Sequence, residues 1–395
     1  MSKRDLFKDK LAHSMDLNAA GKFSEASLIL EEYIKEEPKD YVALVNLASN
    51  YRWLGKTDKA LNLLKESILV NPKGAAAYNN IGNILNQLGK LEESEEEYKK
   101  ALELDPNIDH IHENLGGVLY KLGKFSESIS IYRLSKRNNE AEILQCLLAL
   151  DRIDEFWREI EQLSKNKPQI KVAAISSYVS EKLSIEDIYP FCRNPLDKIL
   201  VSKFNFFDQE LLETLKRVKI ASENSNLDDT YQSLLKNGKQ TSGNFFQTLD
   251  KNLGSAFYQY VSEIAHSYKE TFKNSNDALI NDWPKNHYLY GWFIKMKKQG
   301  YLDYHNHDNA WVSGSVYFQI PEDISEDQAA IKFTCDYKNY PKINDKNLTE
   351  RIIKVKTGDF VVFPSSLYHS TIPFESSSRR ICFAFDLRPH SDLKV

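Results

Sequence analysis

The sequence predicts an α+β chain of two domains, an all-α superhelix of repeated helix pairs followed by an antiparallel β-sandwich or barrel with flanking helices. Two observations predict it: a glycine–lysine pair recurs every 34 residues near the N-terminus, and short apolar strand-like segments fill the C-terminal part. The length of 395 residues also exceeds one ordinary core. We expect the repeats at residues 1–140, a degenerate repeat or helical bridge at 141–197, and the β-rich domain at 198–395.

The repeat is marked by glycine at one point of each unit and by proline at another. Both recur at the same interval, at Gly21, Gly55, Gly89 and Gly123 and at Pro38, Pro72 and Pro106. Glycine supplies the left-handed residue that ends a first helix, and proline cannot continue the hydrogen-bond ladder of a second. Each unit is therefore predicted to be helix, tight turn, helix. One pair cannot bury its apolar face alone, so the units should stack into a superhelix.

These signatures resemble the tetratricopeptide repeat over about residues 7–140. Past Asn139 the pattern decays into one more helix pair at 141–166 and a helix near 169–183. The resemblance implies a protein or peptide bound on the concave face, against the alternative that the repeat only rigidifies or dimerises the molecule. Asparagines recur on the first helices, where they suit either peptide-backbone recognition or a solvated face: Asn46, Asn50, Asn80, Asn83 and Asn114.

From about Lys198 the pattern changes from repeated helices to mixed segments. Short apolar strands are predicted at Ile199–Val201 and Phe204–Phe207, helices at 209–221 and 251–273, and a polar loop at 222–243. Six further strands are then predicted, at 288–297, 310–319, 330–334, 351–356, 359–363 and 380–385. Short strands separated by turn signals indicate a sandwich or barrel.

Composition excludes several classes of function. A formal charge of -4, without a Lys/Arg stripe among aromatics, gives no reason to expect nucleic acid. We expect no secretory signal and no membrane span, because the first residues are charged and the apolar runs are short. The cysteines are widely separated and form no CxxC pair: Cys146, Cys192, Cys335 and Cys382. Such spacing fits reduced thiols, so we expect a cytoplasmic protein.

Three histidines carry the strongest chemical signal. His305 and His307 are two apart, so on a strand their side chains share one face and can aim at a common point. A third ligand from a distant strand, His369, would complete a facial set that leaves positions of an octahedral metal open. A lone histidine is more often a core residue, but a pair followed by an apolar strand and a distant histidine favours a metal site.

The surrounding residues resemble a family of 2-oxoglutarate/Fe(II) oxygenases over about residues 285–387. The pattern is His305-x-His307, the segment 311–321 (WVSGSVYFQIP), then His369 and Arg380. This resemblance implies a double-stranded β-helix (jelly-roll) oxygenase core behind an all-α tetratricopeptide superhelix. A layout in which such repeats precede the oxygenase also resembles some protein hydroxylases. It implies Fe(II) as cofactor, 2-oxoglutarate as cosubstrate, and hydroxylation of a protein or peptide.

Carried over residue by residue, the resemblance makes His305 and His369 metal ligands. Arg380 would pair with the distal carboxylate of 2-oxoglutarate, and Tyr317 either donates a hydrogen bond there or is a core aromatic residue. Most such enzymes have a carboxylate two residues after the first histidine, where this chain has His307. The third ligand is therefore His307, which we favour, or Asp308, which a β-bulge would have to redirect.

The missing carboxylate keeps two other functions open. One is a catalytically inactive oxygenase fold that acts as a protein-interaction scaffold. The other is a three-histidine iron dioxygenase that does not use 2-oxoglutarate, against which Arg380 argues.

Overall fold

The computed structural model describes residues 3–19, 21–205, 208–224, 233–325 and 327–390. It divides into two compact units, Met1–Leu150 and Asp151–Val395. Our boundaries at residues 140 and 197 stay predictions. Within the described residues, no helix combines the length and the apolar character that crossing a bilayer requires.

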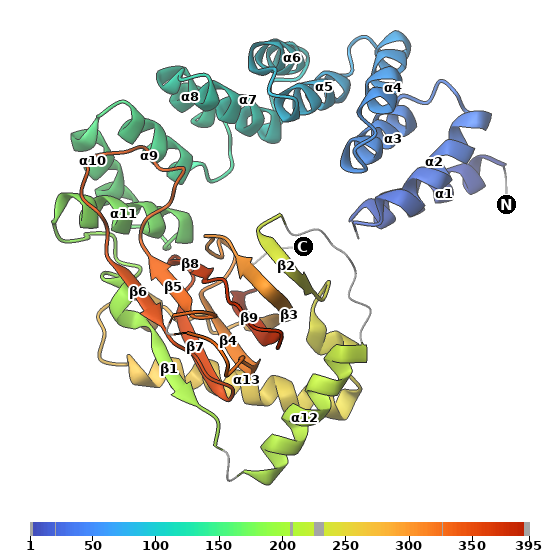
Figure 1. Ribbon diagram of the computed structural model, residues 1–395. Coiled ribbons are helices and arrows are strands. Elements are labelled where there is room, and N and C mark those ends of the chain that lie inside the picture. The colour runs from blue at the N-terminus through green and yellow to red at the C-terminus, as the bar shows by residue number, and fades with distance from the viewer. Residues whose placement is uncertain (1–2, 20, 206–207, 225–232, 326, 391–395) are drawn as a thin grey trace. The chain divides into compact units, whose positions relative to one another are not determined.

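The first unit consists of helices joined by short turns (Figure 1). The helices are α1 (Lys3–Ala19), α2 (Phe23–Glu36), α3 (Tyr41–Trp53), α4 (Thr57–Val70), α5 (Ala75–Gln87), α6 (Leu91–Leu104), α7 (Asp109–Lys121), α8 (Phe125–Tyr132) and α9 (Glu140–Ala149). The four repeat glycines all have φ between 71° and 75°, the left-handed conformation that ends a helix. Helices α2, α4 and α6 each end two residues before a repeat proline. The predicted helix–turn–helix repeat is therefore confirmed.

Close contacts within a repeat explain its small residues. A Cβ atom added at Gly82 would lie 2.7 Å from the ring of Tyr98, so only glycine lets the ring approach this helix. The hydroxyl of Ser94 donates to the carbonyl of Gly82 at 2.7 Å and so joins α6 to α5. The next repeat uses the same residue types one period later. These contacts fix how the two helices of a unit pack.

Several of the recurring asparagine side chains are buried or hydrogen-bonded within the array. Asn50 is buried, Asn83 accepts a hydrogen bond from the hydroxyl of Tyr98, and Asn114 donates to Asn79 on α5 at 3.0 Å. The last bond joins successive repeats. Some of these side chains therefore hold the array together, which is a role that neither of our two sequence interpretations included.

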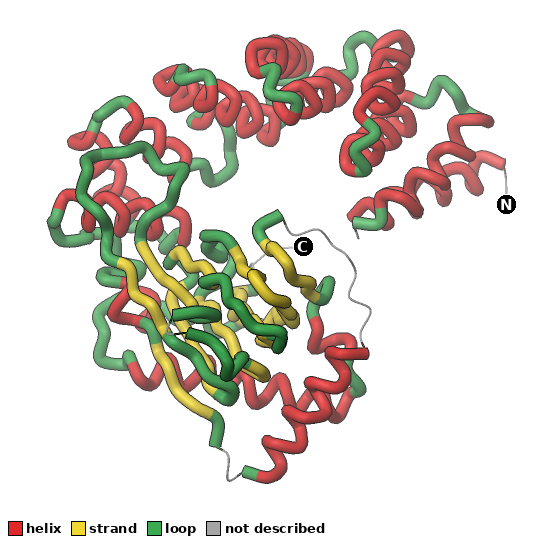
Figure 2. Tube along the Cα trace, in the orientation of Figure 1, coloured by secondary structure: helices red, strands yellow, loops and turns green. Residues whose placement is uncertain are grey.

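The second unit combines helices with two antiparallel sheets (Figures 1 and 2). Its helices are α10 (Ile153–Leu163), α11 (Ile170–Leu183), α12 (Gln209–Asn224), α13 (Lys251–Thr271) and the short α14 (Ala278–Asn281). Its strands are β1 (Leu200–Lys203), β2 (Leu235–Gln240), β3 (His287–Leu302), β4 (Val312–Gln319), β5 (Ile331–Thr334), β6 (Glu350–Ile353), β7 (Asp359–Pro364), β8 (Tyr368–Thr371) and β9 (Arg380–Pro389). The large sheet has the order β1-β7-β4-β9-β3-β2, and the small sheet has the order β6-β5-β8. Two facing antiparallel sheets with flanking helices agree with the predicted oxygenase-type core.

Two strands were missed by the sequence analysis. β2 lies inside the predicted loop 222–243, part of which is outside the described residues, and its sequence LKNGKQ shows little apolar alternation. It is an edge strand, so only one of its sides needs to be paired and few of its side chains are buried. β8 is only four residues long, too short for a pattern. The strand predicted at Phe204–Phe207 is also absent at Phe204 and Asn205, because β1 ends at Lys203; residues 206 and 207 lie outside the described residues.

Helix α13 covers the outer face of the large sheet. Its Phe257 packs edge-on against Phe383 of β9, with ring centroids 4.7 Å apart. Two glycines leave room for this aromatic layer: a Cβ at Gly291 would meet the ring of Phe383 at 2.2 Å, and one at Gly314 would meet the ring of Phe385 at 2.4 Å. With the outer face filled in this way, the inner face of the sheet is left to line a cavity.

Candidate metal centre

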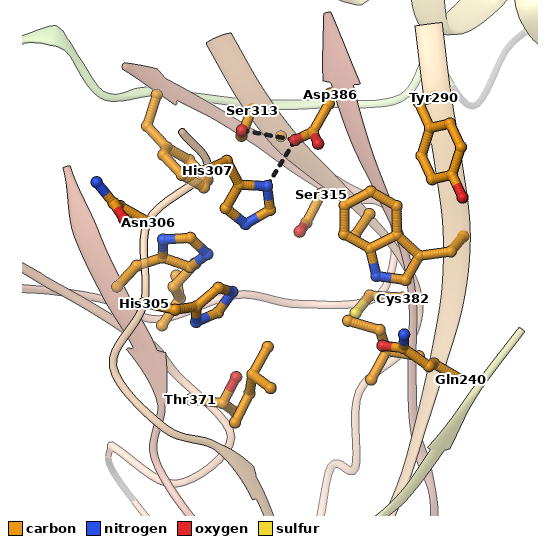
Figure 3. A pocket seen from close by; sticks show the side chains of 18 of the residues that line it. Gln240, Tyr290, His305, Asn306, His307, Ser313, Ser315, Thr371, Cys382 and Asp386 are labelled. Atoms are coloured by element: carbon orange, nitrogen blue, oxygen red, sulfur yellow. Dashed lines mark hydrogen bonds and ion pairs between the residues drawn. The ribbon is translucent and has the colours of Figure 1, made fainter. Parts of the chain in front are cut away.

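Three histidines from two segments of the chain meet at the cavity. His305 and His307 lie between β3 and β4, and His369 lies on β8. The backbones of His305 and His369 pair in an isolated antiparallel bridge, with N–H to carbonyl distances of 3.1 and 2.9 Å. One ring nitrogen from each histidine lies within 4.8 Å of the other two. Figure 3 shows the rings of His305 and His307 on one wall of the pocket. In the part of the chain that the structure describes, this is the one such group of His, Cys, Asp or Glu side chains.

The hydrogen bonds of the rings fix which nitrogen faces the centre. His305 and His369 direct Nδ1 to backbone carbonyls two residues away, at 2.9 and 3.4 Å. His307 directs Nδ1 to a carboxylate oxygen of Asp386 at 2.6 Å. An oxygen acceptor requires a proton on Nδ1, so in the neutral ring Nε2 keeps its lone pair. Nε2 of His307 is buried and has no hydrogen-bond partner. A metal ion would satisfy such a nitrogen.

Burial keeps two of these imidazoles neutral. It lowers the pKa of His305 to about 4, and the neighbouring His307 adds to the effect. The pKa of His369 lies well below its ordinary value because the ring is buried and has the other two histidines beside it. Neutral imidazole is the form that binds a metal ion, so the site is prepared for one at neutral pH.

His307 is held more firmly than the other two. Asp386 on β9 is 1% exposed and also accepts hydrogen bonds from the hydroxyl of Ser313, at 2.8 Å, and from the guanidinium of Arg388, at 2.8 and 3.2 Å. Burial opposes ionisation of Asp386, but His307 and Arg388 outweigh it and lower the pKa of the carboxyl group. Trp292 of β3 stacks on the ring of His307 with centroids 5.8 Å apart. Figure 3 shows the two bonds that Asp386 receives from His307 and Ser313.

Ser313 belongs to the segment 311–321 that carries the family resemblance, but the sequence analysis assigned no supporting role to Ser313, Trp292, Asp386 or Arg388. The available signal was Asp386 itself, a carboxylate in the apolar strand segment ICFAFDL, an even number of residues after Arg380 and therefore on the same face.

Asp308, the alternative third ligand, lies elsewhere. Its side chain is 40% exposed, and its carboxylate is 3.7 Å from the ammonium group of Lys171 on α11. It lines the cavity but is not part of the histidine cluster. The structure thus brings His307, and not Asp308, together with His305 and His369.

Arg380 lies in the same cavity, on the inner face of β9. It is 2% exposed, and its Nε donates to the carbonyl of Ala329 at 3.2 Å. Among the described residues, no Asp or Glu carboxylate forms an ion pair with it. A buried cation without a counterion is costly. The cavity therefore offers a place for an anion.

Tyr317 lies beside this arginine. The guanidinium carbon of Arg380 is 5.2 Å from the centroid of the tyrosine ring, a cation–π contact. The Tyr317 hydroxyl is buried without a hydrogen-bond partner, and burial raises its pKa. Tyr317 is not among the residues that line the cavity. Its contact with the arginine is clear, whereas a contact with a ligand stays a prediction.

The cavity has a volume of about 510 Å³. The three histidines, Arg380 and inner-face side chains of β3, β4 and β9 line it. Alternate residues of β9 face inward: Arg380, Cys382, Ala384, Asp386 and Arg388. The fold and the site together define a class, a double-stranded β-helix of the oxygenase type with a three-histidine cluster and a buried arginine.

Comparison with known families agrees with this class. The family described as "Putative 2OG-Fe(II) oxygenase" matches residues 291–386. Repeat families match the N-terminal part, "Tetratricopeptide repeat" at residues 17–82 and "TPR repeat" at residues 82–123. The chain therefore carries tetratricopeptide repeats followed by a domain of this oxygenase family, and the predicted architecture is confirmed.

Several solved structures are similar to part of the chain. The pilF protein of Pseudomonas aeruginosa is 16% identical, with a TM-score of 0.40 over 46% of this chain and 87% of its own. A thermophilic TPR protein of Thermus thermophilus is 21% identical, with a TM-score of 0.36 over 45% and 99%. A tetratricopeptide repeat protein of Parabacteroides merdae is 19% identical, with a TM-score of 0.37 over 45% and 72%. Similarities of this size carry no argument about function. No curated protein matches the chain.

Proposed function

We propose that the protein is an Fe(II)- and 2-oxoglutarate-dependent dioxygenase that hydroxylates a protein or peptide recruited by its repeats. The observation that supports this most is the combination, in one cavity, of three convergent histidines and a buried arginine without a carboxylate partner. The family match at residues 291–386 supports the same reaction class. The repeats support a protein partner, because such arrays present an extended concave surface.

His305, His307 and His369 would hold the iron. Each ring directs Nδ1 to an oxygen acceptor and so can offer Nε2, and imidazole is a ligand that suits Fe(II) as well as zinc and copper. Bound iron would supply oxygen activation, and decarboxylation of 2-oxoglutarate would supply the two electrons that balance hydroxylation of a C–H bond. The protein's own contribution is to position the cosubstrate and exclude water. The inner faces of both sheets enclose the centre accordingly.

Arg380 would bind the distal carboxylate of 2-oxoglutarate. Its planar fork can donate two parallel hydrogen bonds to a carboxylate, and burial strengthens them. The ring of Tyr317 limits the positions of the guanidinium group, so Tyr317 would support the bound carboxylate through Arg380. The cosubstrate would thus lie between Arg380 and the histidines.

One observation favours a second candidate, a three-histidine iron dioxygenase that does not use 2-oxoglutarate. No carboxylate is among the convergent groups of the described residues, since Asp308 faces Lys171 instead. Only the first candidate requires a carboxylate of 2-oxoglutarate to bind Arg380, so binding of 2-oxoglutarate distinguishes the two.

The test is an anaerobic titration of the Fe(II)-loaded protein with 2-oxoglutarate, followed by the weak visible charge-transfer band of the iron–cosubstrate chelate. We expect a band in the wild type that is weakened or lost in Arg380→Ala. Arg379→Ala is the matched control, because Arg379 is the exposed neighbour and is not among the residues lining the cavity. No band despite one equivalent of bound iron would exclude 2-oxoglutarate and leave the second candidate or the catalytically inactive scaffold.

A further inference from the structure

The three histidines are supported in different ways, and the difference has a chemical consequence. His305 and His369 are oriented by backbone carbonyls, which are neutral. His307 is oriented by the carboxylate of Asp386, at the shortest of the three distances, 2.6 Å. A carboxylate that accepts the Nδ1 hydrogen raises the electron density on Nε2 and makes it a stronger ligand. His307 is therefore the histidine whose donor strength depends on another side chain.

The structure holds Asp386 in place for this role. Its Oδ1 accepts from both His307 and Ser313, and its Oδ2 accepts from Arg388. Ser313 is its direct cross-strand partner on β4, so the pairing of β4 with β9 sets the position of the carboxylate. Since Trp292 stacks on the imidazole of His307, the ring cannot turn away from this bond without losing that contact.

We infer that Asp386 serves, one hydrogen bond away from the metal, as the carboxylate that the three-histidine set itself lacks. In the common set of two histidines and one carboxylate, the negative charge lies on a ligand. Here it lies behind His307 and reaches the metal through the imidazole. Asp386 is thus a positioning residue that also tunes the centre. This inference rests on the metal centre proposed above, but it does not require 2-oxoglutarate.

Replacing Asp386 with asparagine tests the inference because the shape is kept while the charge is lost. An amide nitrogen turned toward His307 would also favour the other tautomer, with the proton on Nε2, where a metal must bind. We expect affinity for the metal to fall about 10–100-fold, the usual effect of removing such a partner. Asp308→Asn is the matched control, since this carboxylate adjoins His307 in sequence but faces Lys171.

The experiment is a titration of the metal-free full chain with Co(II) alone, read from the visible d–d bands, with thermal unfolding measured in parallel. We expect weaker binding and altered bands for Asp386→Asn, and binding within about twofold of the wild type for Asp308→Asn. Unchanged affinity and bands in a folded Asp386→Asn protein, or a larger loss in Asp308→Asn, would overturn the inference.

A second variant covers the case in which Asp386→Asn does not fold because Arg388 is left without its partner. Asp386→Asn/Arg388→Gln removes both charges, and the same criteria apply to it. The cobalt titration also separates the two proposals. A missing 2-oxoglutarate band in the wild type contradicts the proposed reaction, whereas unchanged cobalt binding contradicts only the role of Asp386.

Discussion

Gly116 and Gly117 are neighbours on α7 with different surroundings, and they give a quantitative test of the repeat packing. A Cβ at Gly116 would lie 2.6 Å from the ring of Tyr132, whereas a Cβ at Gly117 would have only the Tyr132 hydroxyl within 4 Å, at 3.7 Å. Alanine should gain about 0.5–1 kcal/mol of helix stability at either position. Overpacking at Gly116 alone should cost about 1–3 kcal/mol. The free energy of unfolding should therefore be about 1–3 kcal/mol lower for Gly116→Ala than for Gly117→Ala.

The assay is equilibrium urea unfolding of the full chain, followed by far-UV circular dichroism. Gly117→Ala should raise the midpoint of the repeat's transition above that of the wild type. The midpoint of Gly116→Ala should lie below that of Gly117→Ala. If Gly116→Ala were as stable as Gly117→Ala or more stable, the close approach of helix and ring would not explain the glycine.

The chain's own repeats suggest a rescue. Gly82 faces a tyrosine as Gly116 does, but the equivalent position in the preceding repeat is Ala48, opposite Leu64 in the same core cluster. The double variant Gly116→Ala/Tyr132→Leu would reproduce this alanine–leucine pair. We expect it to be more stable than the sum of the single variants predicts, with a coupling energy of roughly 0.5–3 kcal/mol. Simple additivity would contradict the assignment of the cost to this contact.

Three further predictions concern the second unit, the cosubstrate and the repeats. Gly314→Ala places a Cβ 2.4 Å from the ring of Phe385 and should lower the free energy of unfolding by about 1–3 kcal/mol; an unchanged thermal midpoint would refute this. Arg380→Lys keeps the charge but loses the planar fork, so 2-oxoglutarate should bind about tenfold more weakly or worse in the charge-transfer titration, and a midpoint like that of the wild type would argue against bidentate binding. The carboxylate of Glu95 is buried, which opposes ionisation, yet lysines such as Lys124, at 2.7 Å, hold its pKa below the ordinary 4.5. The contribution of ionised Glu95 to the free energy of unfolding should be present above about pH 4.5 and be lost as the pH falls through the lowered pKa. The difference in urea midpoint between wild type and Glu95→Gln should therefore disappear in acid. A difference that does not depend on pH would contradict the ion pairs as its cause.

The sequence predicted elements whose cause is local. Gly55 and Pro72 determine helix ends by their own backbone preferences, so the repeat could be identified without any knowledge of its packing. β2 was missed because an edge strand buries little and need not alternate. A sequence predicts an element least well where the fold does not require particular side chains to be buried.

The candidate site shows the same division between local and long-range causes. The two-residue spacing of His305 and His307 is visible in the sequence, and the structure brings both rings to one cluster with His369. The role of Asp386 could not be predicted from the sequence. That role depends on which residue of β4 pairs with Asp386 and on the loop that brings His307 to its carboxylate. Such pairings are long-range, and no local pattern specifies them.

The register of β9 links the stability of the second unit to the chemistry of its cavity. Arg380 and Asp386 share the inner face of the strand, whereas Phe383 and Phe385 alternate with them and point to the other face, where Phe383 packs on Phe257 of α13. A slip of one residue would exchange the two faces, placing the phenylalanines in the cavity and the charged groups in the aromatic layer. The aromatic layer is tightly packed, because even a Cβ atom at Gly291 or Gly314 would clash with a phenylalanine ring. The slipped register, which would bring larger charged side chains into this layer, is therefore strongly disfavoured. The apolar packing behind the sheet therefore determines where the proposed cosubstrate anchor and the support of the third histidine lie.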